Sequence, residues 1–191
     1  MGRKKFERDD MILAARRIVA EEGASRLTLA AVADRIGGTK GAIMHWFPTK
    51  DALVEAVLTH LCTDWDHRFE AETVASSDEV LAPYLRVTRR DDPDTATYGA
   101  AVALALSESP LRVSPVQVAY ARYSSAILTE AAQSEDPVAH VIAWLASEGA
   151  SLMATFRLFE LPPDLREKVF DRLEAMSRSA PSLDQPIRSE A

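Results

Sequence analysis

The stretch from Thr28 to Lys50 carries the side chains whose types and spacing could contact a polyanion. Lys40 and His45 lie outside the apolar positions of a short helix, so both can reach bases or phosphates. Gly41 has no side chain, which lets a phosphate approach the helix start, where N–H groups and the positive end of the helix dipole attract an anion. Lys50 begins the next helix and could clamp another phosphate. This is the chemistry of a DNA contact.

Two short helices must position these side chains. Thr28 and Thr39 are candidate N-caps, because a hydroxyl in that place accepts a bond from a helix N–H. Gly37 and Gly38, where we expect positive φ, end the first helix, and Pro48 ends the second. The apolar positions are Leu29, Val32, Ala33 and Ile36 in the first helix and Ile43, Trp46 and Phe47 in the second. Such a pair indicates a helix-turn-helix, although an αα-hairpin with solvated charges is the alternative.

Further residues extend this pattern over about the first sixty positions. They are Ala14, Ala15 and Gly23; Thr28, Ala33 and Gly37; Thr39, Lys40 and Gly41; Trp46 and Phe47; and Pro48, Thr49, Lys50, Asp51 and Leu53. In this order they resemble the N-terminal domain of the TetR family of bacterial transcriptional repressors. The family usually has a Tyr where this chain has Met44, and that Tyr commonly touches the DNA backbone. We therefore expect Trp46 or His45 to carry more of the contact.

The resemblance implies an all-α protein in which an N-terminal three-helix helix-turn-helix DNA-binding domain joins an α-helical ligand-binding and dimerisation domain. We expect residues 1–50 to form the first domain, 51–179 the second, and 180–191 a disordered tail. The expected DNA-binding residues are Thr28, Thr39, Lys40, Gly41, Met44, His45, Trp46 and Lys50.

Charge and composition agree with a two-domain regulator. The net charge is −7, but residues 1–50 carry +4 and residues 51–191 carry −11, so the basic end is the expected DNA end. No run approaches the roughly 18 apolar residues of a membrane span, and the N-terminus has no apolar signal region. Cys62 is the single cysteine, which allows no internal disulfide. We expect a cytoplasmic bacterial protein with no membrane partner and no cofactor.

Apolar periodicity predicts the remaining helices. Their expected ranges are 9–22, 50–72, 77–88, 96–107, 115–132, 137–159 and 163–178. The helix that starts after Thr49 is long enough to join head to body, and we expect it to be the sole connection. His60, Asp64 and His67 on this helix have a spacing that could ligate a metal, but no fourth ligand is evident, and an exposed polar stripe explains them equally well. No metal site is predicted.

The helix over 137–159 carries two adjacent apolar stripes, which is more apolar face than its own domain needs. One stripe is Val138, Ile142, Leu145, Gly149, Leu152, Phe156 and Phe159. We expect the other, rich in small residues, to meet a second subunit, since the resemblance implies that the last two helices of two copies form a four-helix bundle. The expected interface residues are Ala139, Ala143, Ala146, Ala150, Met153, Val169 and Leu173. A broad internal core is the alternative for either stripe.

Aromatic residues in the body predict a pocket for a small, largely apolar ligand. Long rings against Ala-lined helices leave room, and Arg122 and tyrosine hydroxyls could orient the ligand. The expected ligand-binding residues are Trp65, Phe69, Tyr84, Tyr98, Arg122, Tyr123, Trp144 and Phe156. Ordinary core packing is the alternative for each. The basic cluster of Arg86, Arg89 and Arg90 either is a solvated face or meets a ligand carboxylate.

Together these features predict a homodimeric repressor that binds a palindromic operator in double-stranded DNA and is released by an unidentified small-molecule effector. A helical DNA-binding regulator that senses no ligand is the alternative. An enzyme is disfavoured, because no catalytic Ser/His/Asp, Cys/His or paired-carboxylate arrangement can be assembled from motif spacing.

Overall fold

The computed structural model describes residues 6–76, 79–90, 95–108 and 114–178. Within these ranges the regular secondary structure is entirely helical, which confirms the all-α prediction. The elements are α1 (Arg8–Glu22), the short 3₁₀ helix η1 (Ala24–Arg26), α2 (Leu29–Ile36), α3 (Lys40–Trp46), α4 (Lys50–Ser76), α5 (Leu81–Arg89), α6 (Thr95–Glu108), α7 (Ser114–Ala131), α8 (Pro137–Thr155) and α9 (Pro163–Ser177).

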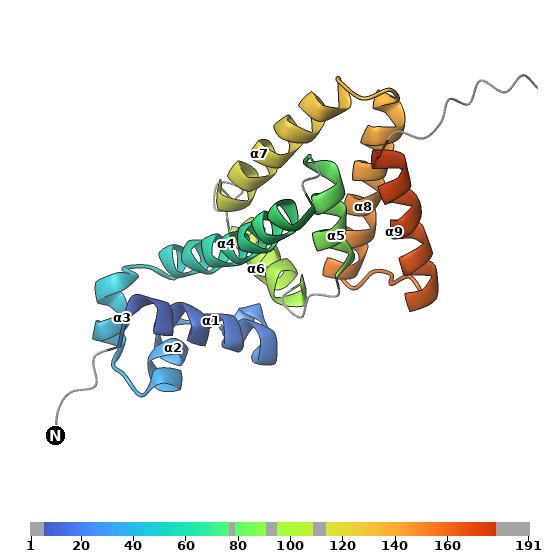
Figure 1. Cartoon of the computed structure of the whole chain (residues 1–191). Coiled ribbons are helices and arrows are strands. Elements are labelled where there is room, and N and C mark those ends of the chain that lie inside the picture. The colour runs from blue at the N-terminus through green and yellow to red at the C-terminus, as the bar shows by residue number, and fades with distance from the viewer. Residues whose placement is uncertain (1–5, 77–78, 91–94, 109–113, 179–191) are drawn as a thin grey trace, which may run out of the picture.

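Helices α1, α2 and α3 form a head at one end of the molecule (Figure 1). Side chains from all three, among them Ile12, Val32 and Ile43, meet in one core with almost no solvent exposure. The five α1 positions expected to face inward are all buried: Met11, Ile12, Ala15, Ile18 and Val19. The apolar spacing of the sequence therefore places the head's inner face correctly.

Helix α4 leads from the head into the body (Figure 1). The Thr49 hydroxyl caps it by accepting a hydrogen bond from the Ala52 N–H at 3.1 Å. Its first half is buried in the head core, whereas Trp65 and Phe69 pack against the body core. The helix continues to Ser76, past the expected end at residue 72. It therefore fills the gap between the expected helices over 50–72 and 77–88.

Helix α6 makes a second connection between head and body, which the sequence analysis missed. It packs against α1 and η1, and its buried Ala101 and Ala105 belong to the same core as the head residues. The prediction that the fourth helix is the sole connection is therefore wrong. The expected domain boundary at residue 50 stays a prediction, although one core contains residues on both sides of it.

The body packs α5, α8 and α9 together, while α7 lies against α4 and α8 (Figure 1). Its core includes Leu81, Leu85, Ile127 and Phe170. Helix α5 begins at Leu81, later than the expected Ser77, which lies outside the described residues. The cap comes from another helix, because the Glu130 carboxylate of α7 accepts hydrogen bonds from the N–H groups of Val80 and Leu81 at 3.0 and 2.8 Å. No local pattern could reveal such a cap.

Helix α8 ends at Thr155 rather than reaching Phe159. Arg157 adopts a positive φ of 52°, and the Leu158 N–H turns back to donate to the Met153 carbonyl at 2.9 Å. The remaining helix ends agree with the sequence expectation to within one residue. Most of the segment between the expected helices over 96–107 and 115–132 lies outside the described residues, as does the whole of the expected tail.

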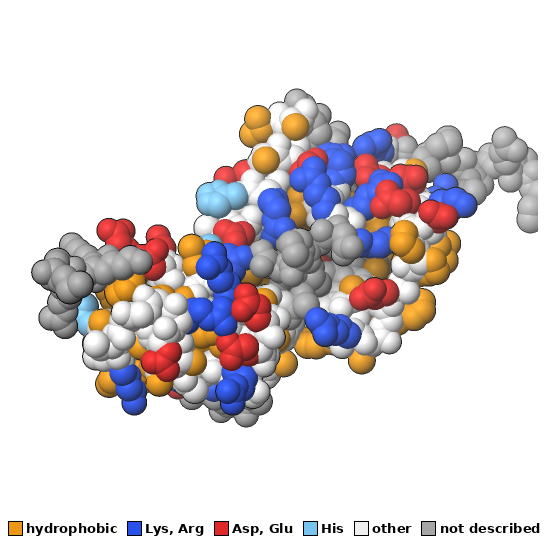
Figure 2. Space-filling view, turned by 90° about the horizontal axis from the view of Figure 1, so that it is seen from below, with side chains coloured by type: hydrophobic (Ala, Val, Ile, Leu, Met, Phe, Trp, Pro, Cys, Tyr) orange, Lys and Arg blue, Asp and Glu red, His pale blue; other side chains and the backbone are white. Residues whose placement is uncertain are grey.

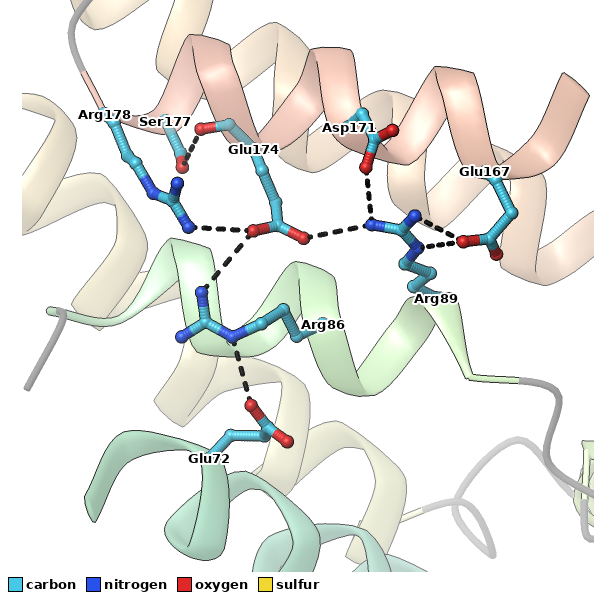
Figure 3. Close-up of polar contacts among 8 residues, drawn as sticks. All are labelled: Glu72, Arg86, Arg89, Glu167, Asp171, Glu174, Ser177 and Arg178. Atoms are coloured by element: carbon cyan, nitrogen blue, oxygen red, sulfur yellow. Dashed lines mark hydrogen bonds and ion pairs between the residues drawn. The ribbon is translucent and has the colours of Figure 1, made fainter. Parts of the chain in front are cut away.

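The basic cluster on α5 makes structural ion pairs that join three helices (Figure 3). Arg86 donates to Glu72 of α4 at 3.0 Å and lies 3.5 Å from Glu174 of α9. Arg89 pairs with three α9 carboxylates, those of Glu167, Asp171 and Glu174. Arg90 also pairs with Glu72. Arg86 and Arg89 are not a solvated face, because their ion pairs fasten α5 between α4 and α9. Arg90 is exposed, and contact of the cluster with a ligand carboxylate stays a prediction.

Candidate functional site

The turn between α2 and α3 is built by local caps. The hydroxyls of Thr28 and Thr39 each accept a hydrogen bond from the N–H three residues later, at 3.0 and 3.3 Å. Gly37 adopts the left-handed conformation with φ 69°. Gly38 does not, contrary to expectation; a side chain there would meet Ile36 and Phe6 instead. The predicted capping residues and the first turn glycine are confirmed.

Helix α3 has one buried and one exposed side. Ile43 and the following Phe47 are almost fully buried, which fixes the helix on the head core. Trp46 was expected on that apolar side, but it is 47% exposed and Met44 is 45% exposed. The Trp46 ring lies edge-on to the exposed His45 ring, with centroids 5.6 Å apart. The exposed side therefore presents a large apolar surface that no described residue covers.

The eight predicted DNA-binding residues lie at the start of α2, on or next to α3, and at the start of α4. All are exposed except Lys50, which is half-buried. A side chain added at Gly41 would meet no atom within 4 Å, so packing inside the chain does not require glycine there. Lys40 forms no ion pair with any residue that the structure describes. Their contact with DNA stays a prediction.

Arg35, another cation of the head, is balanced within the chain. Arg35 of α2 pairs with Glu21 and Glu22 of α1, and these partners raise the pKa of its guanidinium. Figure 2 shows acidic and basic side chains interspersed over one face of head and body. Three further head cations, Arg3, Lys4 and Lys5, lie outside the described residues. The described head is thus less one-sidedly basic than its sequence suggests.

The histidines of α4 serve different contacts and do not gather around a metal. Arg16 of α1 donates to Asp64 at 2.5 Å and lies 2.8 Å from the ring nitrogen of His60. His67 lies 3.8 Å from Glu70 instead. Among the residues described, no three metal-binding side chains come together. This cluster instead holds α1 against α4.

A cavity of about 130 Å³ lies in the body between α4, α5, α6, α7 and α8. Four of the predicted ligand-binding residues line it, namely Trp65, Tyr84, Tyr98 and Tyr123. Four others do not: Phe69 stacks on Trp65, Arg122 pairs with Asp66, Trp144 packs against the body core, and Phe156 is 43% exposed at the end of α8. The aromatic set is therefore brought together only in part.

Sequence reasoning missed Tyr120 and Glu148, which also line the cavity. The Glu148 carboxylate accepts hydrogen bonds from the Tyr84 hydroxyl at 2.6 Å and the Tyr120 hydroxyl at 2.8 Å. Burial and, next, the Glu148 charge raise the pKa of both phenols, so they remain protonated donors. A signal was present, because Glu148 is the one carboxylate in the stretch of residues 137–155.

Cys62 and Tyr123 complete the polar lining. Burial raises the pKa of the Cys62 thiol to about 11, so the group is neutral at ordinary pH. The Tyr123 hydroxyl donates to Asp66 at 2.6 Å and accepts from Arg122 at 2.8 Å. Burial first, and then Asp66, raise the pKa of this phenol. The Asp66 charge is therefore already balanced.

Helix α8 exposes only part of the stripe expected at a subunit contact, together with large side chains of the other stripe. Ala143 is fully buried within the body core, and Leu173 of α9 is also buried, so neither is available to a partner. Ala150 and Val169 pack against the same core, Ala139 is half-buried, and Ala146 and Met153 are exposed. The exposed large side chains of α8 are Val138, Ile142, Leu145, Leu152 and Met153. The small side chain of Ala143 faces inward, where it lets α8 approach its neighbours closely.

None of the described helices combines the length and the apolar character that crossing a membrane requires.

Known proteins resemble this chain in sequence and in fold. The transcriptional regulator BetI of Burkholderia thailandensis is 33% identical over 95 residues, which are 50% of this chain and 49% of that protein. The chain thus matches about half the length of its curated relatives. A TetR-family structure from Streptomyces coelicolor A3 shares the fold with a TM-score of 0.63 and 20% identity, over 87% of this chain and 96% of that one. The structure of the multidrug binding protein EbrR complexed with ethidium has a TM-score of 0.58 and 22% sequence identity. The match covers 87% of this chain and 97% of that one.

Two family models account for most of the chain. Residues 12–57 match the model of bacterial regulatory proteins of the tetR family, and this range contains α2, the turn and α3. Residues 78–178 match the tetracyclin repressor-like C-terminal domain, which is more than half of the chain. Head and body thus match the two parts of one architecture, and the chain belongs to the TetR family of transcriptional regulators.

Proposed function

We propose that this regulator is a repressor that binds a palindromic operator as a homodimer and leaves it when a small ligand occupies the body cavity. The exposed side of α3 is the observation that carries the proposal. It presents Lys40, His45 and Trp46 to solvent while buried Ile43 anchors the helix beneath them. A helix held in this way can enter a major groove without rearranging the head.

Homodimerisation would cover the exposed apolar side of α8. Ile142, Leu145 and Leu152 are each about half exposed on one well-packed helix, and contiguous apolar surface of this kind favours a protein contact. A twofold axis through this face brings the same residues of both copies together. It also sets two heads at a fixed separation, which suits half-sites roughly 34 Å apart or a multiple of that.

Ligand response follows from where the cavity lies. Leu61 and Trp65 of α4 and Tyr98 of α6 line it, and both helices also contribute to the head core. A ligand that favours one arrangement of these helices would bias the heads by its differential affinity for the two arrangements. A tenfold loss of operator affinity requires only about 1.4 kcal/mol of bias. The ethidium complex of EbrR supports small-molecule binding by a protein of this fold.

A gel-shift assay against the DNA that flanks its own gene tests the proposal. We expect Lys40→Ala and His45→Ala to change sequence preference, since their side chains project from α3, and Lys50→Ala to weaken all sites alike and reduce the salt slope by about one. Glu135→Ala is the matched control, because this exposed side chain lies before α8 in the body, away from the head. Unchanged binding by all three head variants would contradict the DNA interface.

Ligand response is tested separately by repeating the shift with small molecules that alter the fluorescence of Trp65. Release of the operator supports repression that a ligand relieves. If no compound binds the chain while operator binding persists, the regulator that senses no ligand replaces this reading.

A further inference from the structure

The carboxylates that line the body cavity are balanced by a cation, with one exception. Asp66 pairs with Arg122, and Arg90 pairs with Glu72. Arg68, which also lines the cavity, donates from Nε to the Asp64 carbonyl of its own helix at 3.2 Å. Each of these groups has a partner within the chain.

Glu148 is the exception. Its contacts are the two phenol hydroxyls, and no ion pair joins it to any residue that the structure describes. Phenols that remain protonated orient a carboxylate but do not neutralise it. A carboxylate has about four acceptor positions, and the two hydroxyls occupy two of them. A half-buried carboxylate without a counter-charge costs free energy, which a bound cation would recover.

Aromatic rings line the same cavity as this carboxylate. Trp65, Tyr84 and Tyr123 lie with their ring centroids 4.7 to 5.6 Å apart, and the rings of Tyr98 and Tyr120 complete the lining. Ring faces carry negative electrostatic potential and attract cations. Tyr123 already shows this behaviour, since the Arg122 guanidinium lies 4.6 Å from its ring centroid.

We propose that the cavity ligand is an organic cation, with Glu148 as its counter-charge and the surrounding rings as its cage. This inference rests on the proposed function, because it names the chemical class of the ligand that the cavity takes. An acid would be repelled by Glu148, and a neutral apolar ligand would shield Glu148 from water without balancing its charge. The expectation that Arg122 orients the ligand is replaced, since Arg122 is held by Asp66 and lies outside the lining.

Three probes of similar shape test the ligand class on the full chain by calorimetry: benzyltrimethylammonium, its neutral isostere neopentylbenzene, and benzylsulfonate. We expect the cation to bind at least about tenfold more tightly than the isostere, and the sulfonate not to bind. Equal affinity for cation and isostere, or tighter binding of the sulfonate, overturns the inference. This comparison uses the unmodified chain, so it tests the ligand class even if a cavity substitution prevents folding.

Substitutions then test the residue. Glu148→Gln keeps the shape and removes the charge, so it should lower cation affinity at least about tenfold and leave the affinity for the isostere within about twofold, while Glu148→Asp should retain much of the preference. Asp66→Asn makes the same change of charge at a carboxylate of the same cavity that is already balanced, and should lower cation affinity less. Glu160→Gln, exposed beyond the end of α8, should change nothing. An unchanged cation affinity in Glu148→Gln overturns the assignment.

Operator binding, measured in parallel, separates the two proposals. If the cation binds and the operator affinity stays constant, release by ligand fails while the ligand class holds. If a neutral or acidic probe binds more tightly than the cation and releases the operator, the ligand class fails while the regulatory function holds.

Discussion

Leu145 of α8 allows a direct test of the proposed homodimer. Its side chain is 56% exposed and lies on the outward side of α8 with Ile142 and Leu152, whereas Ala143 faces the body core. Leu145→Arg places a charge on that side without altering the interior of the subunit. The monomer should therefore fold as before, and the effect should appear in association.

The size of the effect follows from the exposed area. Complete burial of a Leu side chain contributes about 1.5 to 3 kcal/mol, so burial of the exposed half contributes about 0.75 to 1.5 kcal/mol per subunit. A twofold interface contains Leu145 twice, which gives about 1.5 to 3 kcal/mol, or a roughly 13- to 160-fold change in the dimer dissociation constant. An unpaired charge adds to this loss, so the value is a lower bound for Leu145→Arg.

Sedimentation velocity over a concentration series measures the dissociation constant directly. Val118→Arg on α7 is the matched control, because Val118 is 70% exposed and apolar but lies on a different helix. Thermal unfolding by circular dichroism checks that both variants fold. The reasoning is refuted if Leu145→Arg dimerises like the wild type, or if Val118→Arg weakens the dimer equally.

The other predictions concern the close approach of α6 to α8, Gly41 in the head, and the Cys62 thiol and Tyr120 phenol of the cavity. Gly99→Ala should lower the free energy of unfolding by about 1 to 3 kcal/mol in chemical denaturation, because the added Cβ would lie 2.6 Å from the Thr155 carbonyl oxygen. Gly41→Ala should raise it by about 0.5 to 1 kcal/mol and still weaken operator binding in a gel shift, since the methyl meets nothing inside the chain but obstructs a phosphate. Cys62, with its pKa raised to about 11, should react with a thiol reagent at pH 8 far more slowly than in urea. Burial raises the pKa of Tyr120 in the folded chain above its usual value of 10. The free energy of unfolding should therefore keep its full value below pH 10 and decline as the pH rises beyond it. Absorbance at 295 nm that shows phenolate in the folded protein before unfolding would contradict this.

The head could be predicted from sequence because its determinants are local. Thr28 and Thr39 cap helices through bonds to N–H groups three residues away, and Gly37 supplies a left-handed residue at the turn. Each of these features lies within a few residues of its partner. The side on which Trp46 faces could not be predicted in the same way, because helical spacing alone put it beside Phe47.

The body was harder to predict because its determinants join distant residues. Glu130 caps α5 from fifty residues away, and Arg89 reaches the carboxylates of α9 from almost eighty. Both stripes of α8 are apolar, so hydropathy could not decide which one faces inward. Side-chain size could have helped: the core side, at Ala143, has small residues that allow close helix packing, and Leu145 on the other side is large.

The joint between head and body determines what a ligand could change. Leu61 belongs to the core that includes the head and also lines the cavity, so no spacer separates the two. On α6, Tyr98 lines the cavity, and Ala101, one turn later, is buried with the head residues. A ligand that separates α4 from α6 would therefore disturb the packing beneath α1 directly. A single helix could only tilt, whereas two helices in one core transmit both their spacing and their tilt, and close-packed interiors accommodate such changes poorly. If a ligand occupies the cavity, the second connection through α6 would thus make the orientation of the head more sensitive to it than the long α4 alone would.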